Sequence, residues 1–285
     1  MGHILSGLSK FGLGKLEKLE LYDEEKKKKK EPEKVQEIIV IEKPEKDYLF
    51  DKSYVCPVCG ENFKVPTLKA GRGRVIGIDK DLRPRYEGID PIKYDVILCP
   101  RCGYAALGRY FMNITPPQIK LIKKEISRNF NPIASLHEYS YDDAFVRYQL
   151  ALGSAVVKLG ATSEKAYICL RMAWLVRGKQ EQLDKNASNY DEEYNRCVED
   201  EEELLKSAME GFLAARLTEA FPICGMDEHT LDIIIAAIAL RFKDYDLAVN
   251  LLSQIITSKN VNLRLKDRAI EMKNEVIELR KQADM

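Results

Sequence analysis

The chain has 285 residues, of which 45% are hydrophobic and 32% are charged. This composition is typical of a packed globular protein with a highly charged surface. The 45 basic and 45 acidic side chains cancel, so the overall charge does not favour a nucleic acid or an anionic membrane as the partner. The longest apolar run, Leu231 to Leu240, is too short to span a bilayer. The N-terminus lacks the apolar segment of a secretory signal, so we expect a cytoplasmic protein with reduced or metal-bound cysteines.

Residues 1–47 are predicted to form a flexible, charged N-terminal arm. Several glycines interrupt the apolar spacing of its first part, which weakens any helix there. A block of charged residues follows from Asp23 to Lys34 and includes five consecutive lysines. Blocks of this kind are usually solvated and do not pack.

Two copies of one short motif dominate residues 48–114. They read Cys56-Pro57-Val58-Cys59-Gly60 and Cys99-Pro100-Arg101-Cys102-Gly103. In each copy the proline restricts the backbone after the first cysteine, and the glycine tolerates the open angle that a tight turn around sulfur needs. We therefore expect the four cysteines to bind one metal ion in a small zinc-ribbon-like β domain. The 39 residues between Cys59 and Cys99 are enough for a three- or four-stranded sheet.

The predicted metal is Zn²⁺. Four thiolates in a tetrahedron form the closed type of zinc site, whereas a hydrolytic zinc ion keeps one position open for water. A closed site therefore indicates a structural role. Iron is the alternative, because rubredoxin-type electron carriers use the same cysteine motif and a tetrahedral set of thiolates suits either metal.

Residues 115–285 are predicted to be entirely helical. Thr115 is a good N-cap, and Pro116 occupies the first helical position, where its missing N–H is not needed. Apolar residues then recur with helical spacing. The expected helices cover residues 116–130, 142–159, 163–178, 199–220, 228–242, 244–258 and 262–282, with an insertion near 179–198.

The helical part has features of a tetratricopeptide-like array. The segment Lys243-Asp244-Tyr245-Asp246-Leu247-Ala248 resembles the turn of that repeat, and the small residues Ala236 and Ala239 precede it. A weaker copy has Gly160 at the turn and Ala166 at the small position. The two copies are not a whole number of repeats apart, so the array would be irregular. An ordinary helical bundle is the alternative. The expected fold class is therefore α+β, with the β domain followed by the helical one.

These motifs together resemble a bacterial domain-of-unknown-function family, common in Firmicutes, that joins a double C-P-x-C-G head to a tetratricopeptide-like tail. The resemblance covers roughly residues 48–285. It is carried by Cys56–Cys59, Arg83–Pro91, Cys99–Ala106, Cys169–Arg177 and Gly225–Thr230. It implies this architecture and a bound metal, and it implies no catalytic mechanism.

Two sets of side chains are candidates for binding a partner. Arg171, Trp174 and Arg177 are spaced to share one helix face, and tryptophan and arginine are favoured at protein interfaces; a core position for the tryptophan is the alternative. A second set between the two cysteine motifs is basic with one aromatic residue, which is typical of single-stranded nucleic-acid binding. It comprises Lys64, Lys69, Arg72, Arg74, Arg83, Arg85 and Tyr86. The favoured alternative is a solvated β surface, or arginines paired with the acidic helical domain.

No phosphate-binding glycine loop and no nucleophile or metalloprotease motif is present. We therefore expect no enzyme. The sequence favours a zinc-binding adaptor whose helical domain binds a protein or peptide. The alternatives are a nucleic-acid-binding zinc ribbon that uses residues 64–85, and a rubredoxin-like iron electron carrier.

Overall fold

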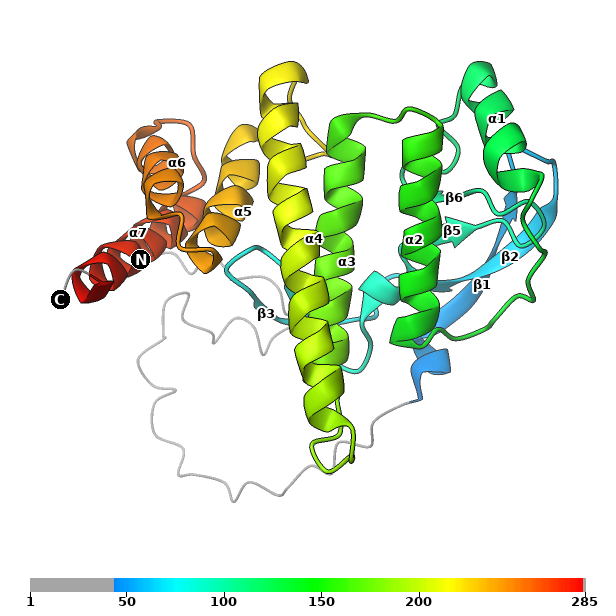
Figure 1. Cartoon of the computed structure of the whole chain (residues 1–285), viewed down its shortest axis with the longest axis horizontal. Coiled ribbons are helices and arrows are strands. Elements are labelled where there is room, and N and C mark those ends of the chain that lie inside the picture. Colours follow the sequence, from blue (N-terminus) through cyan, green and yellow to red (C-terminus); the bar gives the residue numbers. More distant parts are fainter. Residues whose placement is uncertain (1–43, 284–285) are drawn as a thin grey trace, which may run out of the picture. The chain divides into compact units, whose positions relative to one another are not determined.

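The structure is a computed structural model, and it describes residues 44–283. The charged arm predicted for residues 1–47 lies outside the described residues except for its last four positions. Residues 43–285 form one compact unit, in which short β hairpins precede a series of helices (Figure 1). The predicted α+β fold class is confirmed. None of the helices between residues 44 and 283 is long and apolar enough to cross a membrane.

Six short strands form three separate two-stranded antiparallel sheets. The first hairpin pairs β1 (Leu49–Val55) with β2 (Asn62–Leu68). The second pairs β3 (Val75–Ile78) with β4 (Pro84–Tyr86). The third pairs β5 (Val96–Leu98) with β6 (Ala105–Leu107). The segment between the cysteine motifs therefore does not fold into the single three- or four-stranded sheet that its length suggested.

The helices of the structure follow β6. Their bounds are α1 (Pro116–Ile122), α2 (Tyr141–Val157), α3 (Thr162–Glu181), α4 (Tyr190–Thr218), α5 (Glu228–Arg241), α6 (Tyr245–Thr257) and α7 (Leu263–Ala283). A short π-helical turn, Lys123–Ser127, continues α1. Thr115 and Gln118 form a capping box at the start of α1, with Pro116 in the first helical position as expected.

Helix α4 begins at Tyr190 and not at residue 199. Its first turn contains three acidic residues, Asp191, Glu192 and Glu193, which stabilise a helix N-terminus by interacting with the macrodipole. The residues predicted as an insertion are thus partly helical. As a result α3 and α4 pack against each other along much of their length.

One hydrophobic core joins the third hairpin to the helices. Val96, Leu98, Ala105 and Leu107 of β5 and β6 belong to the same buried cluster as the inner faces of α2 to α7. Tyr148 of α2 is fully buried there, and its hydroxyl donates to the carbonyl oxygen of Ile92 at 3.0 Å. The boundary predicted at residue 114 is therefore crossed by a continuous core.

The two predicted repeat turns are both helix–turn–helix connections. Leu159 has a φ of 55° between α2 and α3, and Lys243 has a φ of 62° between α5 and α6. The Asp244 side chain then caps α6 by accepting from the Leu247 amide at 3.1 Å. The interpretation of these hairpins as tetratricopeptide-like repeats stays a prediction.

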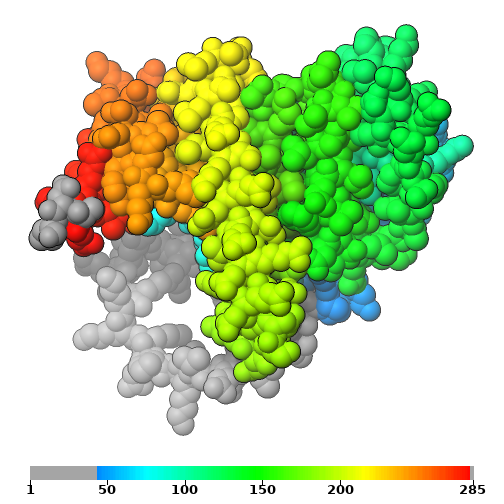
Figure 2. All heavy atoms as spheres, in the orientation of Figure 1, coloured from blue at the N-terminus to red at the C-terminus, as the bar shows by residue number. Residues whose placement is uncertain are grey.

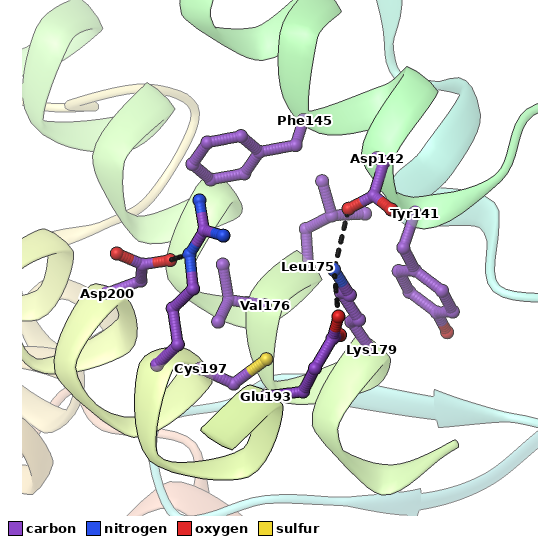
Figure 3. Close-up of a pocket in the computed structure, with 10 residues that line it drawn as sticks. Tyr141, Asp142, Phe145, Leu175, Val176, Lys179, Glu193, Cys197 and Asp200 are labelled. Atoms are coloured by element: carbon purple, nitrogen blue, oxygen red, sulfur yellow. Dashed lines mark hydrogen bonds and ion pairs between the residues drawn. The ribbon is translucent and has the colours of Figure 1, made fainter. Parts of the chain in front are cut away.

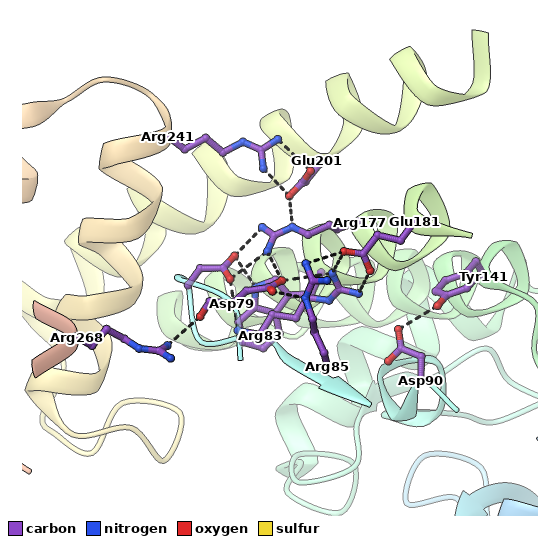
Figure 4. A network of polar contacts seen from close by, with 12 residues as sticks. Asp79, Arg83, Arg85, Asp90, Tyr141, Arg177, Glu181, Glu201, Arg241 and Arg268 are labelled. Carbon is purple, nitrogen blue, oxygen red and sulfur yellow. Dashed lines mark hydrogen bonds and ion pairs between the residues drawn. The ribbon is translucent and has the colours of Figure 1, made fainter. Parts of the chain in front are cut away.

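A polar network fixes the second hairpin to the helices (Figure 4). Arg177 of α3 contacts three carboxylates: its Nη2 is 2.7 Å from Asp81 Oδ2, its Nη1 is 3.0 Å from Asp79 Oδ2, and its Nε is 2.7 Å from Glu201 Oε1. Asp81 and Glu201 are almost completely buried, with side-chain exposures of 7% and 2%. Arg177 is the cation through which a turn of the β region is attached to both α3 and α4.

Further contacts extend this network to α5 and α7. Arg241 of α5 makes two hydrogen bonds to Glu201, at 2.8 and 3.0 Å. Arg268 of α7 donates to the carbonyl oxygen of Asp79 at 2.9 Å. Arg83 makes two hydrogen bonds to Glu181 of α3, at 3.0 and 2.8 Å. Bidentate arginine–carboxylate pairs fix orientation as well as position, so the hairpin has a defined place on four helices.

Replacing Arg177 by methionine should destabilise the fold by about 3–5 kcal/mol, because it leaves the buried carboxylate of Asp81 without its cation. Denaturant unfolding of the metal-loaded protein measures this change. The matched control is Arg196→Met: Arg196 is an exposed arginine of α4 that is 3.9 Å from Asp200, with a side chain 80% exposed, and pairs of this kind contribute little. Equal losses in both variants would contradict the role given to Arg177.

Candidate metal centre

The two cysteine motifs form the turns of the first and third hairpins. In the first turn the Cys56 amide donates to the Glu61 carbonyl and the Gly60 amide donates to the Cys56 carbonyl, both at 2.9 Å. In the second turn the Cys99 amide donates to the Tyr104 carbonyl at 2.9 Å and the Gly103 amide to the Cys99 carbonyl at 3.1 Å. The same sequence thus produces the same backbone loop twice.

The two glycines adopt the left-handed conformation that the motif requires. Their φ angles are 77° at Gly60 and 74° at Gly103, a region that other residues enter only at a cost. At Gly103 space is a second constraint, because a Cβ atom there would lie 2.5 Å from the ring of Phe130. Any larger residue at Gly103 would displace that ring.

The turns bring four sulfur atoms together. Cys56 Sγ is 3.6 Å from Cys102 Sγ, and Cys59 Sγ is 3.6 Å from Cys99 Sγ. All four sulfurs lie within 4.8 Å of one another. A zinc–sulfur bond of about 2.3 Å places neighbouring sulfurs of a tetrahedron about 3.8 Å apart. The donor set and its spacing therefore fit a tetrahedral metal ion, and the predicted convergence of the four cysteines is confirmed.

The electrostatics of the site favour a cation. Hydrogen bonds with Cys102 and Cys99 raise the pKa of the Cys56 thiol, whereas hydrogen bonds with Cys102 and Cys56 lower the pKa of Cys99. Four thiolates this close would repel one another. A divalent metal would remove this repulsion, because it replaces the protons and leaves each sulfur a charged ligand.

An apolar shell surrounds the sulfurs. Cys56, Cys99 and Cys102 are buried and Cys59 is half-buried. The ring of Phe111 stacks on Tyr104 at 5.1 Å between centroids and meets Phe63 edge-on at 6.0 Å. At the surface, Arg101 of one turn pairs with Glu61 of the other at 3.0 Å. Four protein ligands and this packing describe a closed site, which has the character of a structural centre.

The three residues expected to bind a partner contact the chain itself. Trp174 is 4% exposed and donates through Nε1 to Asp81 Oδ2 at 3.0 Å. Arg177 belongs to the polar network described above. The Arg171 guanidinium forms an ion pair with Asp95. The core position is thus the one that Trp174 adopts, and the three side chains do not form one open face.

The predicted nucleic-acid set is divided by the fold. Arg83 is 5% exposed, and it and Arg85 both contact Glu181 and Asp79; their charges are matched within the chain. Tyr86 is half-buried, and burial raises the pKa of its hydroxyl. The remaining basic side chains are exposed: Lys64, Lys69, Arg72 and Arg74. Four of the predicted cations are therefore accessible to solvent.

Two cavities gather residues that sequence reasoning did not connect. One, of about 300 Å³, lies among α2, α3 and α4 (Figure 3). The other, of about 370 Å³, lies between the first hairpin and α3. Their walls come from distant segments and share no motif, so the sequence held no signal for either beyond the apolar stripes of the helices.

The fold and site define a helical protein whose β hairpins carry a cluster of four cysteines that could hold a metal ion. A family model described as an uncharacterized protein conserved in bacteria (DUF2225) matches residues 49–276. The chain belongs to this family, and the predicted resemblance is confirmed. No curated protein and no solved structure gave a match.

We predict one zinc ion per chain. Elemental analysis of protein purified from zinc- and iron-containing medium measures the metal and its stoichiometry. A red protein with equimolar iron would instead support the electron-carrier alternative. Absence of any stoichiometric metal would contradict the site.

Serine at Cys56 or Cys99 should abolish stoichiometric metal binding and unfold the two hairpins, because structural zinc sites supply on the order of 10–16 kcal/mol of apparent binding energy. Cys169→Ala is the control: Cys169 is buried in α3 and its loss should leave the metal content at one. Metal retained by Cys99→Ser would show that the four sulfurs do not act together.

Proposed function

We propose that the protein is a non-catalytic adaptor that contains a structural zinc ion and binds a peptide segment with large apolar and basic side chains. The observation that carries this proposal is the groove of about 300 Å³ among α2, α3 and α4 (Figure 3). A closed metal site supports the non-catalytic part, since four thiolates leave the ion no position for water or substrate.

The groove has an apolar base and a charged rim. Leu175 and Val176 of α3 form the base, and Phe145 of α2 forms part of a wall. On the rim, Lys179 lies 2.7 Å from Asp142 and 3.6 Å from Glu193. An apolar pocket bordered by polar groups is the usual form of a site that receives one or two anchoring side chains.

The charge of α4 indicates the kind of peptide. Between residues 190 and 203 this helix has eight acidic residues and one basic residue, Arg196. The buried Glu201 is neutralised by arginines, but Asp191, Glu192, Glu199 and Glu203 are exposed. Figure 2 shows α4 as a continuous ridge across the molecule. Such a ridge attracts a basic segment and disfavours an acidic one.

The metal centre supports the groove indirectly. Its third hairpin, β5 and β6, packs against α2, and α2 is one side of the groove. Zinc therefore stabilises the wall on which the peptide would lie without contacting the peptide.

A peptide-display selection on the full zinc-loaded chain tests this proposal. We expect the selected peptides to combine large apolar with basic residues. A selected peptide should bind Asp200→Lys at least about tenfold more weakly, which corresponds to 1.4 kcal/mol, because the substitution reverses charge on the groove rim. Fluorescence anisotropy gives both affinities.

The matched control is Glu210→Lys, which makes the same charge change on an exposed position of α4 that does not line the groove. Its affinity for the peptide should equal that of the parent protein. Failure to enrich any peptide, or an equal effect of both variants, would count against the groove as a binding site.

The four exposed basic residues between the cysteine motifs favour nucleic acid as a second candidate partner. It predicts that single-stranded RNA or DNA binds with an affinity that falls steeply with salt, because phosphate contacts release counterions. Glutamine at Lys64, Lys69, Arg72 and Arg74 should remove this salt dependence, whereas Lys259→Gln should not. Titration of a labelled strand at two salt concentrations tests this candidate. An affinity that does not change with salt concentration, or no binding at all, eliminates it.

A further inference from the structure

The cavity of about 370 Å³ lies between the metal-bound hairpins and α3. Tyr54 and Thr67 of the first hairpin form one wall, and Tyr167 and Arg171 of α3 form the opposite one. Asp95, before β5, and Arg109, after β6, complete it. Cavities of this size hold small ligands, and this one has a chemical character different from the peptide groove.

Two arginines from different elements line the cavity, and a lysine lies beside one of its tyrosines. Arg171 is largely buried, with a side chain 13% exposed, and its Nε has no hydrogen-bond partner among the described residues. Arg109 is exposed and donates through Nη1 to the Cys224 carbonyl, which leaves its other donors available. Lys52 is on the strand face that bears Tyr54, with its Nζ 5.2 Å from the centre of that ring.

Aromatic rings stand between these cations. The Arg109 guanidinium lies 5.5 Å and that of Arg171 6.0 Å from the centre of the Tyr167 ring. Tyr54 lines the opposite wall and is half-buried. Both tyrosines line the cavity and can contact a planar ring there, and the arginines offer N–H groups to an anion in the same space.

The balance of charge favours an anion. Asp95 is the carboxylate in the lining, and its pairing with Arg171 uses Nη2 of that arginine. Tyr148 also donates to Asp95, at 3.3 Å. One carboxylate against two arginines in the lining leaves the cavity positive. Asp95 and the Thr67 hydroxyl remain as hydrogen-bonding groups for neutral parts of a ligand.

We propose that this cavity binds a small aromatic phosphate ester of the size of a mononucleotide. Its phosphate group would accept hydrogen bonds from Arg109 and Arg171, with Lys52 nearby, and its ring would lie against Tyr54 and Tyr167. Arginines on two different elements suit a phosphate better than a carboxylate, because a phosphate presents three oxygen atoms in different directions.

This site depends on the metal centre. Two of its walls belong to the hairpins whose turns bind the ion, and Ile97 lines the cavity while packing in the apolar shell of the sulfurs. Loss of the metal separates these walls. The ligand should therefore bind the zinc-loaded protein and not the metal-free protein.

Isothermal titration of the full zinc-loaded chain with the four ribonucleoside monophosphates tests the proposal. At least one should bind with micromolar to submillimolar affinity, and the corresponding nucleoside and inorganic phosphate should each bind at least tenfold more weakly. Arg109→Gln should reduce the affinity for the nucleotide at least tenfold. Arg264→Gln, which changes an exposed arginine of α7 away from the cavity, should have no effect.

Thr67→Phe provides a second test that removes no charge, because it places a ring inside the cavity. It should abolish nucleotide binding while the zinc content remains one per chain. The proposal is overturned if no mononucleotide binds, if phosphate alone binds as tightly as the nucleotide, or if neither Arg109→Gln nor Thr67→Phe weakens binding. These results are independent of the peptide groove, whose Asp200→Lys variant should bind the nucleotide normally.

Discussion

Four sulfur atoms that would repel one another as thiolates are the constraint on which this structure depends. The hairpin turns at Cys56–Cys59 and Cys99–Cys102 place them within 4.8 Å of one another, and a divalent cation makes that arrangement favourable. The third hairpin then packs on α2 and contributes to the main core. The hairpin that carries Cys99 and Cys102 therefore shares its core with the helices, so the β region and the helices form one unit.

The chain between the two cysteine motifs is long for such a site, and the structure shows how it is held in place. Both ends of the segment, at Cys59 and Cys99, lie in the four-cysteine cluster. Its middle, the turn around Asp79 and Asp81, is fixed by Arg177 of α3 and by Arg268 of α7. Buried ion pairs are costly to desolvate, and their best-supported role is to specify one arrangement among several. Here they determine where the second hairpin docks.

Features that depend on residues close together in the sequence could be predicted, and features that depend on distant residues could not. The cysteine site was predictable because a repeated pentapeptide encodes each turn locally, and the helices were predictable from their apolar periodicity. The early start of α4 at Tyr190 was missed because its first turns are polar and lack a clear stripe. The excess of basic residues between 64 and 85 left two interpretations open, a nucleic-acid-binding surface and arginines that are solvated or paired with the acidic helices. In the fold Glu181, far along the chain, pairs with Arg83 and Arg85. Charge counted along the sequence does not include partners brought in by the fold.

Neither cavity could be predicted from the sequence, because the walls of each come from residues far apart in the chain. The two cavities also differ in charge. The peptide groove is built by helices alone, and its acidic side comes from the charge run at the start of α4. The second cavity is lined by the first and third hairpins together with α3, and its two arginines come from the loop after β6 and from α3. If zinc occupies the four-cysteine site as proposed, it acts on the second cavity through these hairpins and on the groove only through α2.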